Sequence, residues 1–459
     1  MYIIIYNIYL IDNFMGVEGL YKFINNTCAN VYEVINITDI KRKPCIIDGM
    51  QHIYTQLIYM RTKNKEIINE YGKNISHIHG LLNSLTYYLK NKIIPIFVFD
   101  GKSPEIKRRK IEERKNNLRN NLKKLKELEN AKKDIDNYLS NDLLFSDDIT
   151  NLQDRLIFGT PPESINIDEE LKKVVDIQEE YNKIYKKSII LKDYYICDWI
   201  QILELLGIPV IKAEGEADPL CAYLLNKNNN IFGIISDDSD MLVFGAPRIM
   251  RKTLNQQFKI IELYKLLSTI ENKLKIDMNK DIKFVLDDLL NFSILLGTDY
   301  GNFNIKKKYD NSYDLLKEYI LNKDILNFID ESELEKFNLI RDYYLNNNFD
   351  DKYKENELFN SKPTWQKPKL MELKKRLLEL FVDEDYIDKN NELFDDYYNK
   401  YIQKYSINYS YINYYNKEFN PNISRSKPIN IVNNKIYSIN VDNFNYKDDK
   451  DDNEYNNLL

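Results

Sequence analysis

Acidic side chains are concentrated in one stretch of the chain, between residues 213 and 240. The acids of this stretch are Glu214, Glu216, Asp218, Asp237, Asp238 and Asp240. An apolar run over 231–235 lies between the two groups and predicts one buried strand. Carboxylates packed this closely raise one another's pKa, and a divalent metal would hold them together. Helix capping by Asp and Glu is the rival interpretation, and this stretch alone leaves both open.

Three further acids follow apolar runs elsewhere in the chain. Asp48 follows Cys45-Ile46-Ile47, Asp100 ends the run over 93–100, and Asp299 comes after 294–298. If these runs are parallel strands or core helices, five separate segments deliver acids to one edge of a sheet. Oxygen-only ligands select hard cations such as Mg²⁺ or Mn²⁺. Two such ions about 4 Å apart activate a water and stabilise the leaving oxygen of a phosphodiester.

Strand and helix patterns alternate around these acids. Strands are predicted over 45–48, 93–100, 208–211 and 231–235, and helices over 54–61, 78–89 and 194–206. This alternation predicts an α/β fold with a mostly parallel, twisted sheet flanked by helices, with helix following strand up to Gly297. From Lys102 to Leu191 strand signals are few, and the leucines at 118, 122, 125 and 128 have helical spacing. We therefore expect a long helical insertion there, interrupted at Pro161-Pro162.

Composition limits the class of protein. The chain has 459 residues and a formal net charge of −6, which is enough for one large or two medium domains. Four scattered cysteines and three histidines argue against a structural zinc site or a disulfide framework, and they favour an intracellular protein. No segment reaches the roughly 20 apolar residues of a membrane span.

Charge is distributed unevenly along the chain. Residues 101–126 carry eleven Lys or Arg against three acids, a local balance of +8, whereas 442–459 carry six acids against two lysines, a balance of −4. A basic segment beside an acid cluster is typical of an enzyme that binds phosphates and cuts them with metals.

The order and wording of six short motifs resemble the flap endonuclease and XPG family of structure-specific 5′ nucleases. The resemblance covers roughly residues 15–115 and 191–305. It implies a PIN-like 5′-nuclease fold, with the insertion as a helical arch and a helical C-terminal region. The motifs lie at 15–20, 46–54, 98–104, 213–218, 236–242 and 295–300.

The resemblance also implies roles for the acids. Asp48, Asp100, Glu214 and Glu216 would hold a first Mg²⁺, and Asp238, Asp240 and Asp299 would hold or orient a second, with Mn²⁺ as a possible substitute. We expect Asp218 and Asp237 to act as capping or outer groups.

The resemblance also implies roles for basic and aromatic residues. Lys107 and Arg114 are seven residues apart and so share a helix face; they would contact the scissile phosphate, with a solvated basic face as the rival interpretation. Tyr54 would stack on a base near the cut, unless it is a core tyrosine. Arg61 would contact a DNA phosphate.

The chain departs from the family in three places. Residues 1–14 precede the family-like start at Met15, so we expect translation to begin there or the extension to be trimmed or disordered. The hairpin after Asp299 lacks the second glycine and the proline of the family's Gly-Ile-Gly-Pro, which leaves Lys306, Lys307 and Lys308 as candidate DNA contacts. The insertion is longer than a compact arch.

The sequence therefore predicts a metal-dependent 5′ nuclease acting on branched or flapped DNA. The alternatives are a 5′–3′ exoribonuclease of the same superfamily and a non-catalytic scaffold of the same fold. No sliding-clamp motif is present in the tail, and no membrane partner is expected. The predicted regions are a 1–14 extension, a nuclease region over 15–115, a helical arch over 116–190, a second nuclease region over 191–305, a helical region over 306–420 and a polar tail over 421–459.

Overall fold

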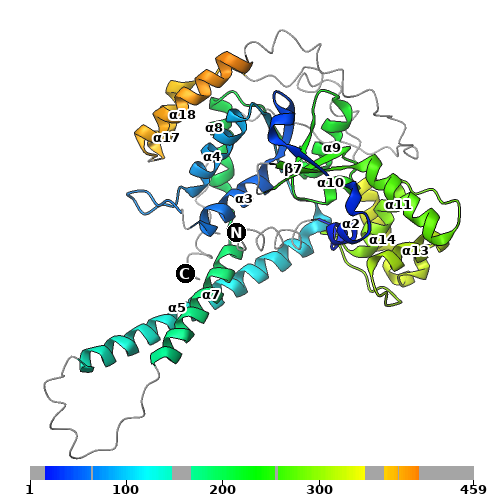
Figure 1. The fold of residues 1–459 in the computed structure, drawn as a ribbon, viewed down its shortest axis with the longest axis horizontal. Helices are drawn as coiled ribbons and strands as arrows, with labels where there is room; N and C mark the ends of the chain where they lie inside the picture. Colours follow the sequence, from blue (N-terminus) through cyan, green and yellow to red (C-terminus); the bar gives the residue numbers. More distant parts are fainter. Residues whose placement is uncertain are drawn as a thin grey trace, which may run out of the picture. The chain divides into compact units, whose positions relative to one another are not determined.

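A seven-stranded mixed sheet forms the centre of the computed structural model (Figure 1). The strand order is β1-β7-β6-β5-β2-β3-β4; pairing is parallel from β6 through β4 and antiparallel at β6-β7 and β7-β1. The strands are β1 (Glu33–Asn36), β2 (Pro44–Asp48), β3 (Ile94–Phe99), β4 (Val210–Lys212), β5 (Gly233–Ile235), β6 (Arg248–Lys252) and β7 (Gln257–Glu262). The structure describes residues 16–63, 66–146, 167–253, 257–346, 366–380 and 382–402, without the side chains of 134–146, 167–174, 187, 401 and 402.

Helices follow most of the strands. They are α2 (Leu20–Thr27), α3 (Gly49–Thr62), α4 (Ser76–Lys90), α5 (Arg108–Ser146), α7 (Ile167–Lys187), α8 (Asp193–Leu205), α9 (Ala217–Lys227), α10 (Asp240–Val243), α11 (Leu263–Met278), α12 (Leu286–Leu296), α13 (Ser312–Asn322), α14 (Leu334–Leu345), α17 (Leu370–Glu379) and α18 (Glu384–Tyr397). Short 3₁₀ turns lie at Ala29–Val31, Ile37–Ile40, Glu105–Lys107, Ile325–Asn327 and Glu331–Glu333, and a π-helical turn at Tyr398–Ile402. None of the described helices is long and apolar enough to cross a membrane.

The central strands are continuous apolar runs because both of their faces are covered. Every residue of β2 and β3 is buried, and the two strands pair in parallel with Ile47 opposite Phe97. Parallel register brings the carboxyl ends of these strands to the same edge of the sheet, so Asp48 and Asp100 leave the sheet side by side.

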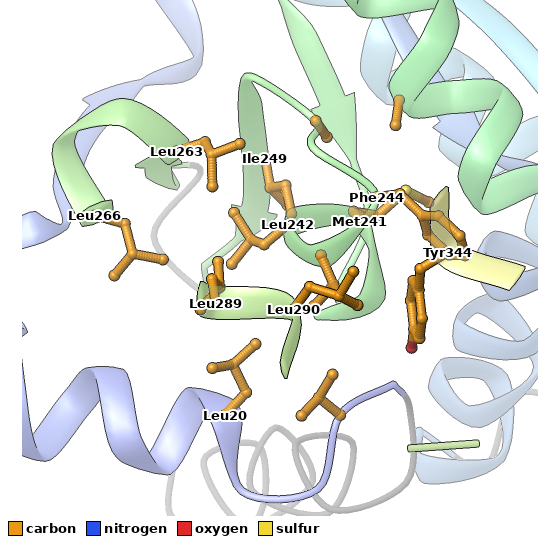
Figure 2. Close-up of a cluster of buried hydrophobic side chains, with 14 of the residues drawn as sticks. Leu20, Met241, Leu242, Phe244, Ile249, Leu263, Leu266, Leu289, Leu290 and Tyr344 are labelled. Atoms are coloured by element: carbon orange, nitrogen blue, oxygen red, sulfur yellow. The ribbon is translucent and has the colours of Figure 1, made fainter. Parts of the chain in front are cut away.

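Apolar helices pack against the sheet near this edge. Leu242 of α10, Ile249 of β6 and Leu289 of α12 belong to one cluster of buried side chains, with Leu20 of α2 completing it (Figure 2). Burying each leucine contributes roughly 1.5–3 kcal/mol. This packing holds the short helix α10, which begins at Asp240, in a defined place.

The described chain forms two compact units. The first contains residues 16–57, 66–110 and those from 192 onward; the second contains 58–63, 111–146 and 167–191. Within the second unit, α5 and α7 pack together as a two-helix arm. Leu122 and Leu125 of α5 are buried, as their spacing predicts, while Lys124 pairs with Glu180 across the arm at 2.5 Å.

The predicted fold class is confirmed, with one correction. The uninterrupted alternation of strand and helix up to Gly297 is wrong, because β6 and β7 follow one another as an antiparallel pair that β1 extends. Burial in β7 alternates from Gln257 to Ile260, as in a strand with one covered face, and Ile261 after it is buried as well. Residues 1–14, Pro161-Pro162 and the tail over 421–459 lie outside the described residues.

Candidate metal centre

Asp48 and Asp100 are placed by the ends of β2 and β3. The Oδ1 atom of Asp48 accepts a hydrogen bond from the Gln51 backbone N–H at 3.1 Å, at the beginning of α3. The Oδ1 atom of Asp100 accepts one from the Ala217 N–H at 2.6 Å, the first residue of α9. Both acids therefore cap helices with one oxygen. Capping and metal binding are compatible, because each carboxylate has a second oxygen.

Asp218, Asp238 and Asp240 form the tightest group of acids. One carboxylate oxygen from each lies within 4.8 Å of the others, and all three residues are buried. They come from the first turn of α9, the loop after β5 and the first residue of α10. The expected role of Asp218 as a capping or outer group stays a prediction; Asp218 lies in the first turn of α9 and also inside this group.

Burial and mutual repulsion shift the acids toward their protonated forms. Burial, followed by the charge of Asp100, raises the pKa of Asp48 to about 8. Burial, followed by the charge of Asp238, raises the pKa of both Asp218 and Asp240 well above the ordinary range. Bound cations relieve such repulsion, and a donor set made only of carboxylate oxygens fits a hard divalent metal.

Lys107 connects two further acids, Glu216 and Asp299, to the carboxylates described above. Its ammonium contacts Glu216 and lies 3.6 Å from Oδ2 of Asp299. Burial lowers the pKa of Lys107, but Glu216 and Asp299 more than reverse this effect and raise it. Electrostatic interactions link these residues to the other acids. We call the following set the acid cluster: Asp48, Asp100, Glu216, Asp218, Asp238, Asp240 and Asp299.

The segment that begins the family-like sequence forms part of the wall of the acid cluster. Gly16 has φ +77°, and a Cβ there would clash with Oδ1 of Asp238 and lie 2.6 Å from Oγ of Ser239. The next backbone N–H, that of Val17, donates to the same Ser239 Oγ at 2.9 Å. Only glycine permits both this conformation and this approach to the acids.

Glu214 occupies a different environment from Asp218. It is half-buried in the loop between β4 and α9, and its backbone carbonyl accepts a hydrogen bond from Lys102 N–H at 2.7 Å. A second backbone hydrogen bond, from Gly101 N–H to the Gly215 carbonyl, connects this loop to the segment after β3. Its predicted role as a ligand stays a prediction.

The other predicted residues lie as follows. Tyr54 is half-buried on α3. Arg61, also on α3, donates from Nη1 to the carbonyls of Tyr185 and Ser188 at 2.8 Å each, at the end of α7. Arg114 lies on α5 in the second unit. The DNA contacts predicted for these three residues stay predictions.

The three lysines after Asp299 are exposed, and two of them have intramolecular partners. Lys306 donates to the Leu326 carbonyl at 2.7 Å, and Lys307 to Glu318 at 2.6 Å. Lys308 is exposed as well.

Three tyrosines beside the acid cluster were not predicted. Tyr300 and Tyr343 donate hydrogen bonds to Oε2 of Glu216 at 2.5 and 2.7 Å, and Tyr344 donates to Oδ1 of Asp240 at 3.1 Å. In a chain with 36 tyrosines no local signal distinguishes these three. For Asp218 a signal existed, because Glu216-x-Asp218 repeats the spacing of Asp238-x-Asp240.

Comparisons with known proteins point to one family. Residues 15–121 match the XPG N-terminal domain and residues 207–299 match the XPG I-region. Flap endonuclease 1 of Methanococcus aeolicus is 30% identical over 275 residues, which is 59% of this chain and 67% of that protein. Flap endonuclease 1 of Theileria parva is 26% identical over 336 residues; the match covers 72% of this chain but only 56% of the relative.

A solved structure shares the fold. The flap endonuclease-1 from Methanococcus jannaschii superposes with a TM-score of 0.50 at 20% identity, covering 80% of this chain and 96% of that one. At this identity the likeness speaks for the arrangement of strands and helices, which agrees with the sheet described above.

Proposed function

The chain belongs to the XPG family of flap endonucleases, and from this premise we propose that it is a divalent-metal-dependent, structure-specific 5′ nuclease that hydrolyses phosphodiester bonds of branched or flapped DNA. The observation that carries the proposal is the acid cluster, in which segments far apart in the sequence contribute buried carboxylates to one place. A fold alone would not support an activity, because function depends on the site.

The acids would hold two Mg²⁺ ions, with Mn²⁺ able to substitute. When bound, such ions supply an activated water and stabilise the charge on the leaving oxygen. Ligands of the first ion would come from Asp48, Asp100, Glu214 and Glu216. Asp238, Asp240 and Asp299 would hold or orient the second, and Asp218, whose carboxylate lies within 4.8 Å of those of Asp238 and Asp240, would join them.

Basic residues would bind the DNA backbone. The ammonium of Lys107 lies against Glu216 and Asp299, and a metal ion bound by these acids would displace it toward a phosphate that enters the same place. Arg114 would add a second positive charge at that phosphate, and Tyr54 would stack on the neighbouring base. Arg61 and the lysines at 306–308 would contact phosphates of the duplex.

Cleavage of end-labelled DNA tests the proposal. The substrates are a 5′ flap, a gap, a bubble and a four-way junction, each incubated with Mg²⁺, and uncapped RNA runs in parallel. We expect cleavage near the branch that leaves 5′-phosphate ends. Asp238→Asn serves as the inactive control because it removes a buried carboxylate while keeping the side-chain shape. Equal activity of wild type and Asp238→Asn would reject the metal assignment, and cutting of RNA alone would support the exoribonuclease alternative.

A further inference from the structure

Two adjacent tyrosines of α14, Tyr343 and Tyr344, contact the acid cluster through their hydroxyl groups. Tyr343 donates to Oε2 of Glu216 at 2.7 Å, and Tyr344 donates to Oδ1 of Asp240 at 3.1 Å. Tyr344 is buried and Tyr343 is largely covered. These contacts join a helix downstream of Asp299 to carboxylates that lie more than 100 residues earlier in the sequence.

The phenols occupy particular oxygens of the two acids. A carboxylate oxygen has two lone-pair sites. Oε2 of Glu216 accepts from both Tyr300 and Tyr343, so both of its sites are used. The ammonium of Lys107 lies at the other oxygen, Oε1. An ion that replaces this ammonium therefore meets Glu216 through Oε1 alone.

Both phenols are held rigidly. Arg341 anchors α14 to α12 by donating to Asp287 at 2.6 Å and to Asn291 at 3.1 Å. The ring of Tyr343 lies 4.6 Å from that of Tyr300, and the ring of Tyr344 lies 4.6 Å from that of Phe244. Figure 2 shows Tyr344 beside Phe244 at the edge of the buried apolar cluster. Packed rings of this kind keep a hydroxyl aimed at one acceptor.

We propose that Tyr343 and Tyr344 are positioning residues that favour Mg²⁺ over Ca²⁺: Tyr343, together with Tyr300, restricts Glu216 to one metal-binding oxygen, and Tyr344 biases Asp240 in the same direction by using one of the two lone-pair sites of its Oδ1. Mg²⁺ demands near-octahedral geometry with short bonds, whereas Ca²⁺ accepts both oxygens of one carboxylate in a larger and more flexible shell. The inference rests on the proposed function in that it assumes the acid cluster holds the metal. The inference places a source of metal selectivity in α14, which follows the last proposed ligand, Asp299, in the sequence.

The test is metal binding measured by isothermal titration calorimetry, without DNA, on Tyr343→Phe, Tyr344→Phe and the double variant. Each substitution removes the hydroxyl and keeps the ring. Tyr319→Phe is the control, because Tyr319 of α13 is buried like Tyr344 and its hydroxyl bonds with Asp288 and Asn291, outside the acid cluster. Mg²⁺ and Ca²⁺ are titrated separately into the full chain.

In the double variant we expect the ratio of Mg²⁺ to Ca²⁺ affinity to fall about tenfold, the worth of one hydrogen bond to a charged group. The single variants should fall less, and Tyr319→Phe should keep the wild-type ratio even where its unfolding temperature drops. A ratio within about twofold of wild type in both single variants and in the double variant would overturn the proposal. If wild type binds Mg²⁺ but cleaves no branched DNA, the proposed function fails while this binding test still decides the inference.

Discussion

The acid cluster and the two-helix arm are both rich in charged residues, yet their charges behave in opposite ways. In the acid cluster, six carboxylates are between 1% and 9% exposed, and several have neighbours of the same sign. In the arm, Lys124 and Glu180 are 52% and 46% exposed and pair with each other. Like charges that remain together under burial indicate a bound cation, whereas exposed charges that pair with opposite charges, as Lys124 does with Glu180, need no such ion.

The comparison teaches that charge density alone does not locate a site. Residues 101–126 have a local charge balance of +8, which is a clear signal in the sequence. The exposed ion pairs of the two-helix arm nevertheless contribute only about 0–1 kcal/mol each to the free energy of unfolding. The acids are individually ordinary in the sequence. They become a site because parallel strands and two helix starts bring them to one buried place.

The largest effect should come from removing a carboxylate from the acid cluster. We expect Asp218→Asn to lower the rate of flap cleavage by about a hundredfold or more, because each ligand supports several kcal/mol of charge stabilisation. Glu214→Gln is the matched variant outside the 4.8 Å group and should lose less activity. Single-turnover rates at saturating Mg²⁺ check the order, and the reverse order would remove Asp218 from the proposed metal ligands.

A smaller effect is expected at the wall of the acid cluster. Gly16→Ala should lower cleavage about tenfold, because the new Cβ displaces Asp238 and the strained backbone costs roughly 1–3 kcal/mol. Gly19→Ala is the control: Gly19 also has a positive φ, +71°, but a Cβ there meets nothing within 4 Å. Gly19→Ala should lower the unfolding temperature and keep the cleavage rate. Equal activity losses would show that backbone strain, not contact with Asp238, is responsible.

Burial should also govern how stability depends on pH. Burial lowers the pKa of His52 to about 3, so the folded state keeps this ring neutral while the unfolded state protonates it near 6.5. At this residue the unfolded state therefore binds more protons in acid, and the contribution of His52 to stability falls by about 1.4 kcal/mol per pH unit as pH drops from 6.5 toward 3. His52→Phe keeps an aromatic ring against Trp199 and removes this contribution. Urea unfolding of both proteins between pH 7 and pH 5 measures the difference, and parallel curves would contradict the prediction.

The smallest effect is expected in the two-helix arm. Lys124→Glu should change the free energy of unfolding by about 0–1 kcal/mol, because water and salt screen this exposed pair. The double exchange Lys124→Glu with Glu180→Lys should restore the wild-type value. Thermal unfolding at low and high salt, without DNA, checks both variants. A loss well above this range would mean that the arm depends on its charges as the acid cluster does.

Much of the site could be predicted from local sequence. The apolar runs before Asp48 and Asp100 predict buried parallel strands, and the structure has both strands. The spacing of Glu216-x-Asp218 favours Asp218, but Glu214-x-Glu216 has the same spacing, so the local sequence did not decide between Glu214 and Asp218. Which acid faces Asp238 depends on where α9 begins. This helix begins at Ala217, whose backbone N–H donates to Asp100, the residue that follows β3.

By itself the sequence determined the fold class, the strands of the parallel core and the family, because these depend on the periodicity and order of short segments. Only the tertiary structure decided which acids share one place, and it added Tyr343 and Tyr344 to them. The reason is physical: a hydrogen bond between Tyr343 and Glu216 spans 127 residues, and its formation depends on the packing of α14 against α12, which no local pattern encodes.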